Sequence, residues 1–119
     1  MIISPLSIII PVYNEVENIP ILTKEIIDAL GTSINFEILF INDGSTDDTN
    51  VILKKLKDEL KVGYVNHKYN TGQSSALLTG IKKSKYETIV TLDGDCQNDP
   101  ADIISLLEIY FSDENIKLV

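Results

Sequence analysis

Short apolar stretches rich in β-branched residues alternate along the chain with segments in which apolar positions recur every three or four residues. The apolar stretches predict strands buried on both faces of a parallel sheet, because they do not alternate with polar residues. The periodic segments predict helices with one buried face. The expected strands are Leu6–Pro11, Phe36–Asn42, Val62–Asn66, Thr88–Leu92 and Ile116–Val119.

Four helices are expected between and after these strands. Their apolar stripes are Ile19, Leu22, Ile26 and Leu30; Ile52, Leu53, Leu56 and Leu60; Ala76, Leu77, Gly80 and Ile81; and Ile103, Leu106, Leu107 and Tyr110. Gly31 is expected to end the first helix. Ser45 or Thr46 is expected to cap the second helix. Asp47 and Asp48 then fall in its first turn, where the helix dipole favours negative charge.

This order of strands and helices predicts an α/β fold, a three-layer sandwich in which helices cover both faces of a mainly parallel sheet through right-handed crossovers. The length of 119 residues fits one domain. The last expected strand, Ile116–Val119, has no closing helix after it, so we expect the chain to be part of a longer domain.

The net charge of the chain limits the kinds of molecule that it is expected to bind. The chain has 18 acidic and 10 basic residues, a formal net charge of −8. This argues against a nucleic-acid-binding surface, which needs a basic patch. An anionic substrate stays possible, because a bound metal ion can supply positive charge. The single cysteine, Cys96, excludes an intrachain disulfide and suits a reducing compartment. No segment reaches the ~18 consecutive apolar residues of a membrane span.

Polar and acidic residues follow each expected strand, at the edge where open α/β sheets bind their ligands. Asp93 and Asp95 come directly after a buried strand and are separated by one glycine. Two carboxylates so placed can reach one hard cation together, and Gln97 offers a further oxygen. Mg²⁺ or Mn²⁺ prefers such ligands. The alternative is a solvated acidic turn that begins the next helix.

Asp43 follows the second strand. Its carboxylate could accept hydrogen bonds from a nucleobase imide or a ribose. It could also form an Asx turn, because the segment 42–45 (Asn-Asp-Gly-Ser) is typical turn chemistry, and the two roles are compatible.

The segment 70–74 (Asn-Thr-Gly-Gln-Ser) precedes the third helix. Small residues such as Gly72 let backbone N–H groups approach a phosphate at a helix N-terminus. An ordinary connection with a capping serine is the alternative, and the ending of a P-loop is absent. We do not expect His67 or Cys96 to be catalytic. His67 has no serine or cysteine partner in the sequence, and the acidic neighbours of Cys96 disfavour its thiolate.

Taken together, the four strand-end segments resemble the family 2 glycosyltransferases, specifically the Rossmann-like nucleotide-binding half of their GT-A fold. The matching segments are 11–15, 42–47, 70–74 and 93–100. The last two look like the branch that transfers sugars to polyprenyl phosphates, such as dolichyl-phosphate mannosyltransferase and undecaprenyl-phosphate glycosyltransferases. Residues 1–119 would then be the nucleotide-sugar-binding part of the catalytic domain.

The resemblance also implies roles for particular residues. Substrate would be bound by Pro11, Tyr13, Glu15, Asp43, Gly72 and Asp93, with the first four lining the base and ribose pocket. Asp93, Asp95 and Gln97 would hold Mg²⁺ or Mn²⁺ against the diphosphate of the donor. Tyr69 stands where related enzymes often carry Arg, a contact that Lys68 could partly replace. No residue is assigned as catalytic.

The implied reaction is metal-dependent, inverting transfer of a sugar from a UDP- or GDP-linked donor to a polyprenyl phosphate. It would take place at the cytoplasmic face of a membrane, with membrane association through a part of the protein beyond this chain. Two other hypotheses stay open. One is a non-catalytic module that binds a nucleotide or a protein partner. The other is a receiver-like domain that accepts a phosphoryl group on Asp43 or Asp93.

Overall fold

The computed structural model describes residues 5–31, 34–60 and 62–94. Within them, strands and helices alternate as the sequence predicts. The elements are β1 (Leu6–Val12), α1 (Asn18–Leu30), β2 (Phe36–Asp43), α2 (Thr49–Glu59), β3 (Val62–His67), α3 (Gln73–Lys83) and β4 (Thr88–Thr91). The predicted helix over 103–110 and the predicted strand over 116–119 lie outside the described residues.

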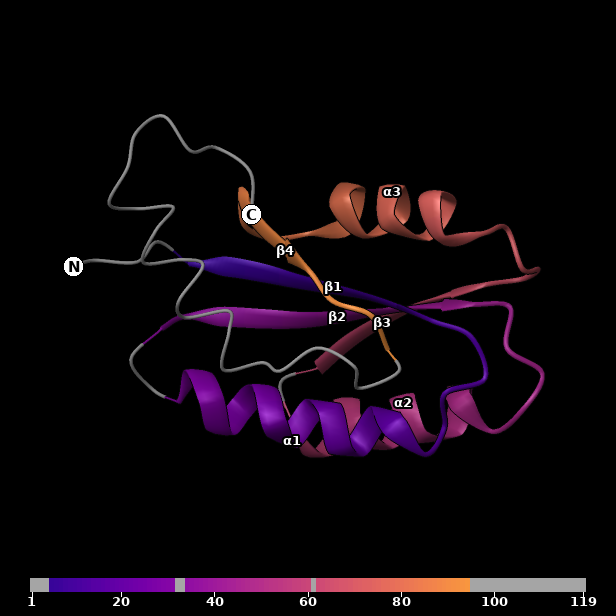
Figure 1. The fold of residues 1–119 in the computed structure, drawn as a ribbon, viewed down its shortest axis with the longest axis horizontal. Coiled ribbons are helices and arrows are strands. Elements are labelled where there is room, and N and C mark those ends of the chain that lie inside the picture. The colour runs from indigo at the N-terminus through magenta and orange to yellow at the C-terminus, as the bar shows by residue number, and fades with distance from the viewer. Residues whose placement is uncertain (1–4, 32–33, 61, 95–119) are drawn as a thin grey trace.

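The strands of the described residues form one parallel sheet in the order β3-β2-β1-β4. In its register, Ile8 of β1 lies between Ile38 of β2 and Val90 of β4. Figure 1 shows α1 and α2 together on one face of the sheet and α3 on the other. The predicted α/β fold, with a parallel sheet between two helical layers, is confirmed.

The central strand β1 is buried on both faces, which explains its largely apolar sequence. Leu6, Ile8 and Ile10 belong to the larger core cluster, which includes the buried apolar residues of α1 and α2. Ile9 belongs to a second cluster with Ala76 of α3. Because successive side chains of a strand point to opposite faces, a strand covered on both sides is apolar at nearly every position, and its buried polar residue, Ser7, donates a hydrogen bond to the carboxylate of Glu37.

Helix α3 lies very close to the sheet at Gly80. A Cβ atom at this position would lie 2.3 Å from Cγ2 of Ile9 and 3.4 Å from Cγ1 of Ile41, so only glycine lets the helix backbone come this near. The predicted buried stripe of α3 is partly wrong. Ala76 is buried, but Ile81 is 48% exposed, because the residue after Gly80 is rotated about 100° away from the sheet.

The start of α2 also differs from the prediction. The helix begins at Thr49, and the carboxylate of Asp47 accepts hydrogen bonds from the Thr49 hydroxyl and, at 2.9 Å, from its backbone N–H. Burial raises the pKa of Asp47, but these donors outweigh it and the net shift is downward. Ser45 and Thr46 do not cap the helix. They bond instead to Asn14 in the loop after β1.

Candidate functional site

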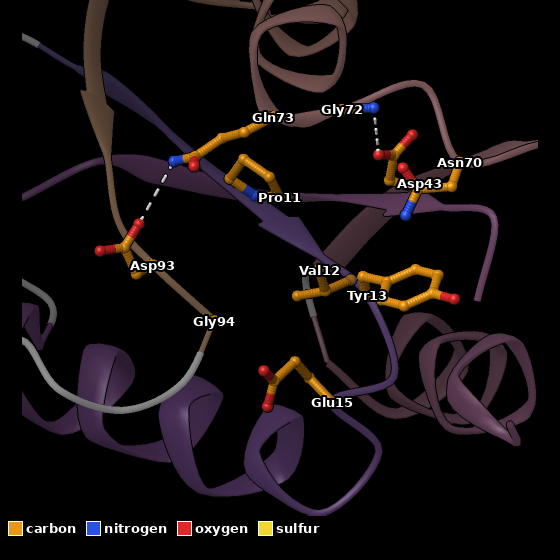
Figure 2. Close-up of a pocket in the computed structure, with 10 residues that line it drawn as sticks. All are labelled: Pro11, Val12, Tyr13, Glu15, Asp43, Asn70, Gly72, Gln73, Asp93 and Gly94. Atoms are coloured by element: carbon orange, nitrogen blue, oxygen red, sulfur yellow. Dashed lines mark hydrogen bonds between the residues drawn. The ribbon is translucent and has the colours of Figure 1, made fainter. Parts of the chain in front are cut away.

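The carboxyl ends of β1, β2 and β4 and the N-terminus of α3 surround a cavity of about 420 Å³ (Figure 2). It is lined by Pro11, Val12, Tyr13, Glu15, Asp43, Asn70, Gly72, Gln73, Asp93 and Gly94. The residues predicted to bind substrate therefore all lie in one cavity, at the edge of the sheet where α/β folds bind ligands. Of the predicted metal ligands, Asp93 lines the cavity, whereas Asp95 and Gln97 lie outside the described residues.

The buried carboxylate of Asp43 is held by donors from the loop between β3 and α3. Its Oδ1 accepts hydrogen bonds from the backbone N–H of Thr71 at 2.9 Å and from the Thr71 hydroxyl at 2.8 Å. Nδ1 of His67 lies 2.9 Å from the same oxygen. Oδ2 accepts one bond, from the backbone N–H of Gly72 at 2.9 Å (Figure 2). Among the described residues, Oδ1 is thus saturated, while Oδ2 keeps a lone pair for a ligand.

The charge of Asp43 follows from these contacts. Burial raises the pKa of this carboxyl group, because it disfavours the charged form. The bonds from His67, Thr71 and Gly72 stabilise the carboxylate, and the net pKa lies below the usual value of 3.8. At neutral pH the side chain is therefore ionised and acts only as an acceptor.

The turn after β2 is made by the neighbour of Asp43. Oδ1 of Asn42 accepts a hydrogen bond from the backbone N–H of Ser45 at 3.2 Å, and its Nδ2 donates to Oδ1 of Asn66 at 2.9 Å. The sequence left open whether Asp43 forms this Asx turn. The structure gives that bond to Asn42, so that Asp43 is left to bond the loop before α3.

The loops after β1, β2 and β3 are joined to one another directly. Oδ1 of Asn14 accepts a hydrogen bond from the backbone N–H of Thr46 at 2.8 Å, and Asn14 itself has a left-handed backbone with φ of 54°. Gly44 has φ of 74°, and a Cβ there would lie 2.4 Å from the backbone nitrogen of Asn70. These contacts fix the loops that carry the walls of the cavity.

Asp93 stands apart from Asp43 in the cavity, with Pro11 between them in Figure 2. Its side chain is exposed, and the described contact to it is a long hydrogen bond of 3.4 Å from Nε2 of Gln73. A carboxylate with one weak neutral partner and a face to the cavity fits the donor chemistry of Mg²⁺ or Mn²⁺. The described residues include no cluster of three His, Cys, Asp or Glu side chains that could hold a metal ion.

The other wall residues come from the loop after β1. Tyr13 is 45% exposed, so its ring offers an accessible apolar surface. The carboxylate of Glu15 accepts a hydrogen bond of 2.7 Å from Nδ2 of Asn18, at the start of α1. Gly94, which follows β4, lies against the end of β1, since a Cβ there would be 2.7 Å from Cγ1 of Val12. The ends of β1 and β4 are therefore in direct contact.

The cavity is acidic. Among the described residues, its lining includes three carboxylates and no lysine or histidine. The lysine proposed from the sequence as a cationic contact, Lys68, has its Nζ 5.6 Å from the ring centre of Tyr69, and neither residue lines the cavity. Asn70 and Gln73 do line it, although neither was predicted from the sequence to bind substrate. Both lie in the segment 70–74 that was singled out from the sequence.

A parallel α/β sheet with a cavity at its strand ends, rimmed by carboxylates and backed by a helix N-terminus, is the arrangement of Rossmann-like α/β folds. The chain belongs to glycosyl transferase family 2, whose family model matches residues 7–116.

Relatives and solved structures agree with this assignment. The chain is 35% identical, over 98% of its length, to an undecaprenyl-phosphate 4-deoxy-4-formamido-L-arabinose transferase from Sodalis glossinidius. It is 34% identical, over 86% of its length, to a dodecaprenyl-phosphate galacturonate synthase from Rhizobium johnstonii. A mannosyltransferase from Pyrobaculum calidifontis, solved with GDP-Man and Mn²⁺, has the same fold over 93% of this chain and 33% of its own, with a TM-score of 0.79 and 21% identity. S. aureus TarS, solved with UDP-GlcNAc, matches 91% of this chain and 31% of its own, with a TM-score of 0.73 and 22% identity.

The chain spans about a third of the length of these two curated relatives, 36% and 31% respectively. Within the described residues, no helix combines the length and the apolar character needed to cross a membrane.

Proposed function

We propose that residues 1–119 are the nucleotide-sugar-binding part of a catalytic domain that transfers a sugar from a UDP- or GDP-linked donor to a polyprenyl phosphate. The observation that carries the proposal is a single cavity that joins an apolar ring and a buried acceptor, Tyr13 and Asp43, to an exposed carboxylate, Asp93. The names of the two curated relatives support the lipid phosphate as acceptor. The donors named with the two solved structures support the class of donor.

The nucleoside would occupy the side of the cavity formed by β1 and β2. Oδ2 of Asp43, which has one described donor, would accept a hydrogen bond from a base imide or a ribose hydroxyl. The exposed ring of Tyr13 would stack on the base, and Pro11 and Glu15 would complete the pocket. An ionised Asp43 can bind only a hydrogen-bond donor, such as the imide N–H of uracil or guanine. It would repel an anionic group at the same place.

The diphosphate would lie between the N-terminus of α3 and the end of β4. Gly72 lines the cavity, and no atom lies within 4 Å of the place that a Cβ would occupy there, which leaves room for a phosphate. Asp93 would hold a divalent ion together with Asp95 and Gln97, and that ion would supply the positive charge that the acidic lining lacks. The proposed cofactor is Mg²⁺ or Mn²⁺.

The acceptor chemistry requires little from the described residues. A polyprenyl phosphate is anionic at neutral pH, so its oxygen can attack the anomeric carbon without a strong general base. Holding the donor with its anomeric carbon exposed would supply the rate through proximity and charge stabilisation. In-line attack would invert the anomeric configuration. The whole enzyme would act at the cytoplasmic face of a membrane, where a nucleotide sugar and a lipid phosphate meet.

Calorimetry with UDP and GDP, each with and without Mn²⁺, tests the proposal. We expect the chain to bind one diphosphate with a metal-dependent component, and Asp93→Ala to remove that component. Asp58→Ala is the matched control, because Asp58 is exposed on α2, away from the cavity. A folded wild-type chain that binds neither diphosphate at millimolar concentration would contradict the proposal. Sugar transfer to a polyprenyl phosphate by the chain itself would exclude a module that only binds.

A further inference from the structure

His67, at the end of β3, is held at both of its ring nitrogens. Nδ1 lies 2.9 Å from Oδ1 of Asp43 and 3.0 Å from the hydroxyl oxygen of Thr71. Nε2 lies 2.8 Å from the hydroxyl oxygen of Thr79, in the middle of α3. The side chain of His67 is 15% exposed and does not line the cavity. The ring of His67 therefore links Thr79 of α3 to the carboxylate of Asp43 in the cavity wall.

The chemistry of the partners fixes which nitrogen carries the proton. The ionised carboxylate of Asp43 can only accept, so Nδ1 must donate. The Thr79 hydroxyl lies 2.8 Å from Nε2 and 3.1 Å from the backbone oxygen of Ser75, and it can donate its hydrogen to either. A neutral ring protonated at Nδ1, with Thr79 donating to Nε2, satisfies every group. This is the less common tautomer of a free neutral histidine, so its presence would report the pairing with Asp43.

We propose that His67 is a positioning residue of the nucleotide site: held by Thr79, its ring fixes Oδ1 of Asp43 and so keeps Oδ2 available to a donor group of the nucleoside. This inference rests on the proposed function. A carboxylate can rotate about its χ2 bond, and the donors on Oδ1 decide which oxygen meets the cavity. Thr71 and Gly72 belong to a loop, whereas His67 ties the carboxylate to a strand and a helix, which are the more rigid supports.

Two variants at this position separate the two ends of the bridge. In His67→Asn the side-chain amide nitrogen lies near the place of Nδ1, so it keeps a donor for Asp43 and loses the contact to Thr79. In His67→Gln the amide nitrogen reaches toward the place of Nε2, so it keeps the contact to Thr79 and loses the donor for Asp43. We expect His67→Gln to bind UDP or GDP, with Mn²⁺, about tenfold more weakly than wild type, and His67→Asn to bind within about threefold.

Thr79 provides a second, independent comparison. Thr79→Val removes the hydroxyl that holds Nε2 but leaves His67 in place, and we expect it to weaken binding about threefold. Thr79→Ser keeps the hydroxyl and should restore the wild-type affinity. If Thr79 acted only through the packing of its methyl group, Thr79→Ser would not restore the affinity, because serine lacks that methyl group.

The tautomer is measured without any ligand. His67 is the single histidine of the chain, so long-range ¹H–¹⁵N spectra contain one imidazole. Above neutral pH we expect the Nδ1–H form in wild type and its loss in Asp43→Asn. An Nε2–H ring in wild type would overturn the inference. So would equal affinities of His67→Gln and His67→Asn in a chain that binds. A wild-type chain that binds neither diphosphate would instead overturn the proposed function, and this inference with it.

Discussion

Replacing Gly80 with alanine tests how closely α3 lies to the sheet. In an exposed helix this change stabilises by about 1 kcal/mol, because alanine has the higher helix propensity. Here the added Cβ would lie 2.3 Å from Cγ2 and 3.3 Å from Cδ1 of Ile9. Ile9 is fully buried in the central strand, so relieving the overlap costs about 1–3 kcal/mol. We expect Gly80→Ala to lower the free energy of unfolding by about 1 kcal/mol.

The assay is urea unfolding followed by circular dichroism, with the midpoint and the slope fitted separately. Ile9→Leu provides the matched partner, because leucine lacks the Cγ2 branch that the new Cβ would meet. We expect the double variant to be more stable than the sum of the two single changes predicts. A Gly80→Ala chain more stable than wild type, or a double variant that shows no such coupling, would refute the close packing of α3.

Three further changes test the loops and the charge of the site. Gly44→Ala should destabilise by about 2 kcal/mol or more, because it combines a left-handed backbone with overlap against the backbone of Asn70, and urea unfolding measures it. Gly31 has φ of 59° and ψ of −142°, a region that only glycine adopts readily, and no atom lies within 4 Å of an added Cβ, so Gly31→Ala should cost about 1–3 kcal/mol through backbone strain alone in the same experiment. The folded-state pKa of Asp43 is lowered, so its carboxylate stabilises the fold above pH 3.8 and that stabilisation disappears as the pH falls through the lower folded value. We therefore expect wild type to exceed Asp43→Asn in stability at pH 7, with a difference that shrinks in unfolding curves below pH 4; a difference independent of pH would show that the charge contributes nothing.

The sequence predicted the layers and the position of the cavity because both follow from local pattern. Largely apolar runs such as Leu6–Pro11, which do not alternate with polar residues, are typical of strands covered on both faces, and β1 has this environment. Residues directly after parallel strands must meet at one edge of the sheet, so Tyr13, Asp43 and Asp93 were brought together by topology alone. That they bind substrate stays a prediction.

The hydrogen-bond partners could not be predicted from local sequence patterns, because they join residues that are far apart in the chain. Ser45 and Thr46 have the composition of a helix cap, yet Asn14 lies close enough to take their bonds, and nothing near residue 45 signals a partner in the loop after β1. The same holds for His67. The sequence places no nucleophile beside His67, and its hydrogen-bond partners are a carboxylate and a threonine from other elements.

The two sides of the sheet are held with unequal strength. Among the described residues, α1 and α2 share a large apolar cluster with the sheet, whereas the side of α3 has a small one, formed by Ile9, Leu39, Ile41 and Ala76. Helix α3 should therefore detach from the sheet at a lower free energy than α1 or α2. Its first turn supplies a wall of the cavity, so a ligand that binds there shares its binding free energy with the docking of the helix. By thermodynamic reciprocity, a change that stabilises the docking of α3 on the sheet should also raise the affinity for the ligand, until the helix is docked in nearly every molecule.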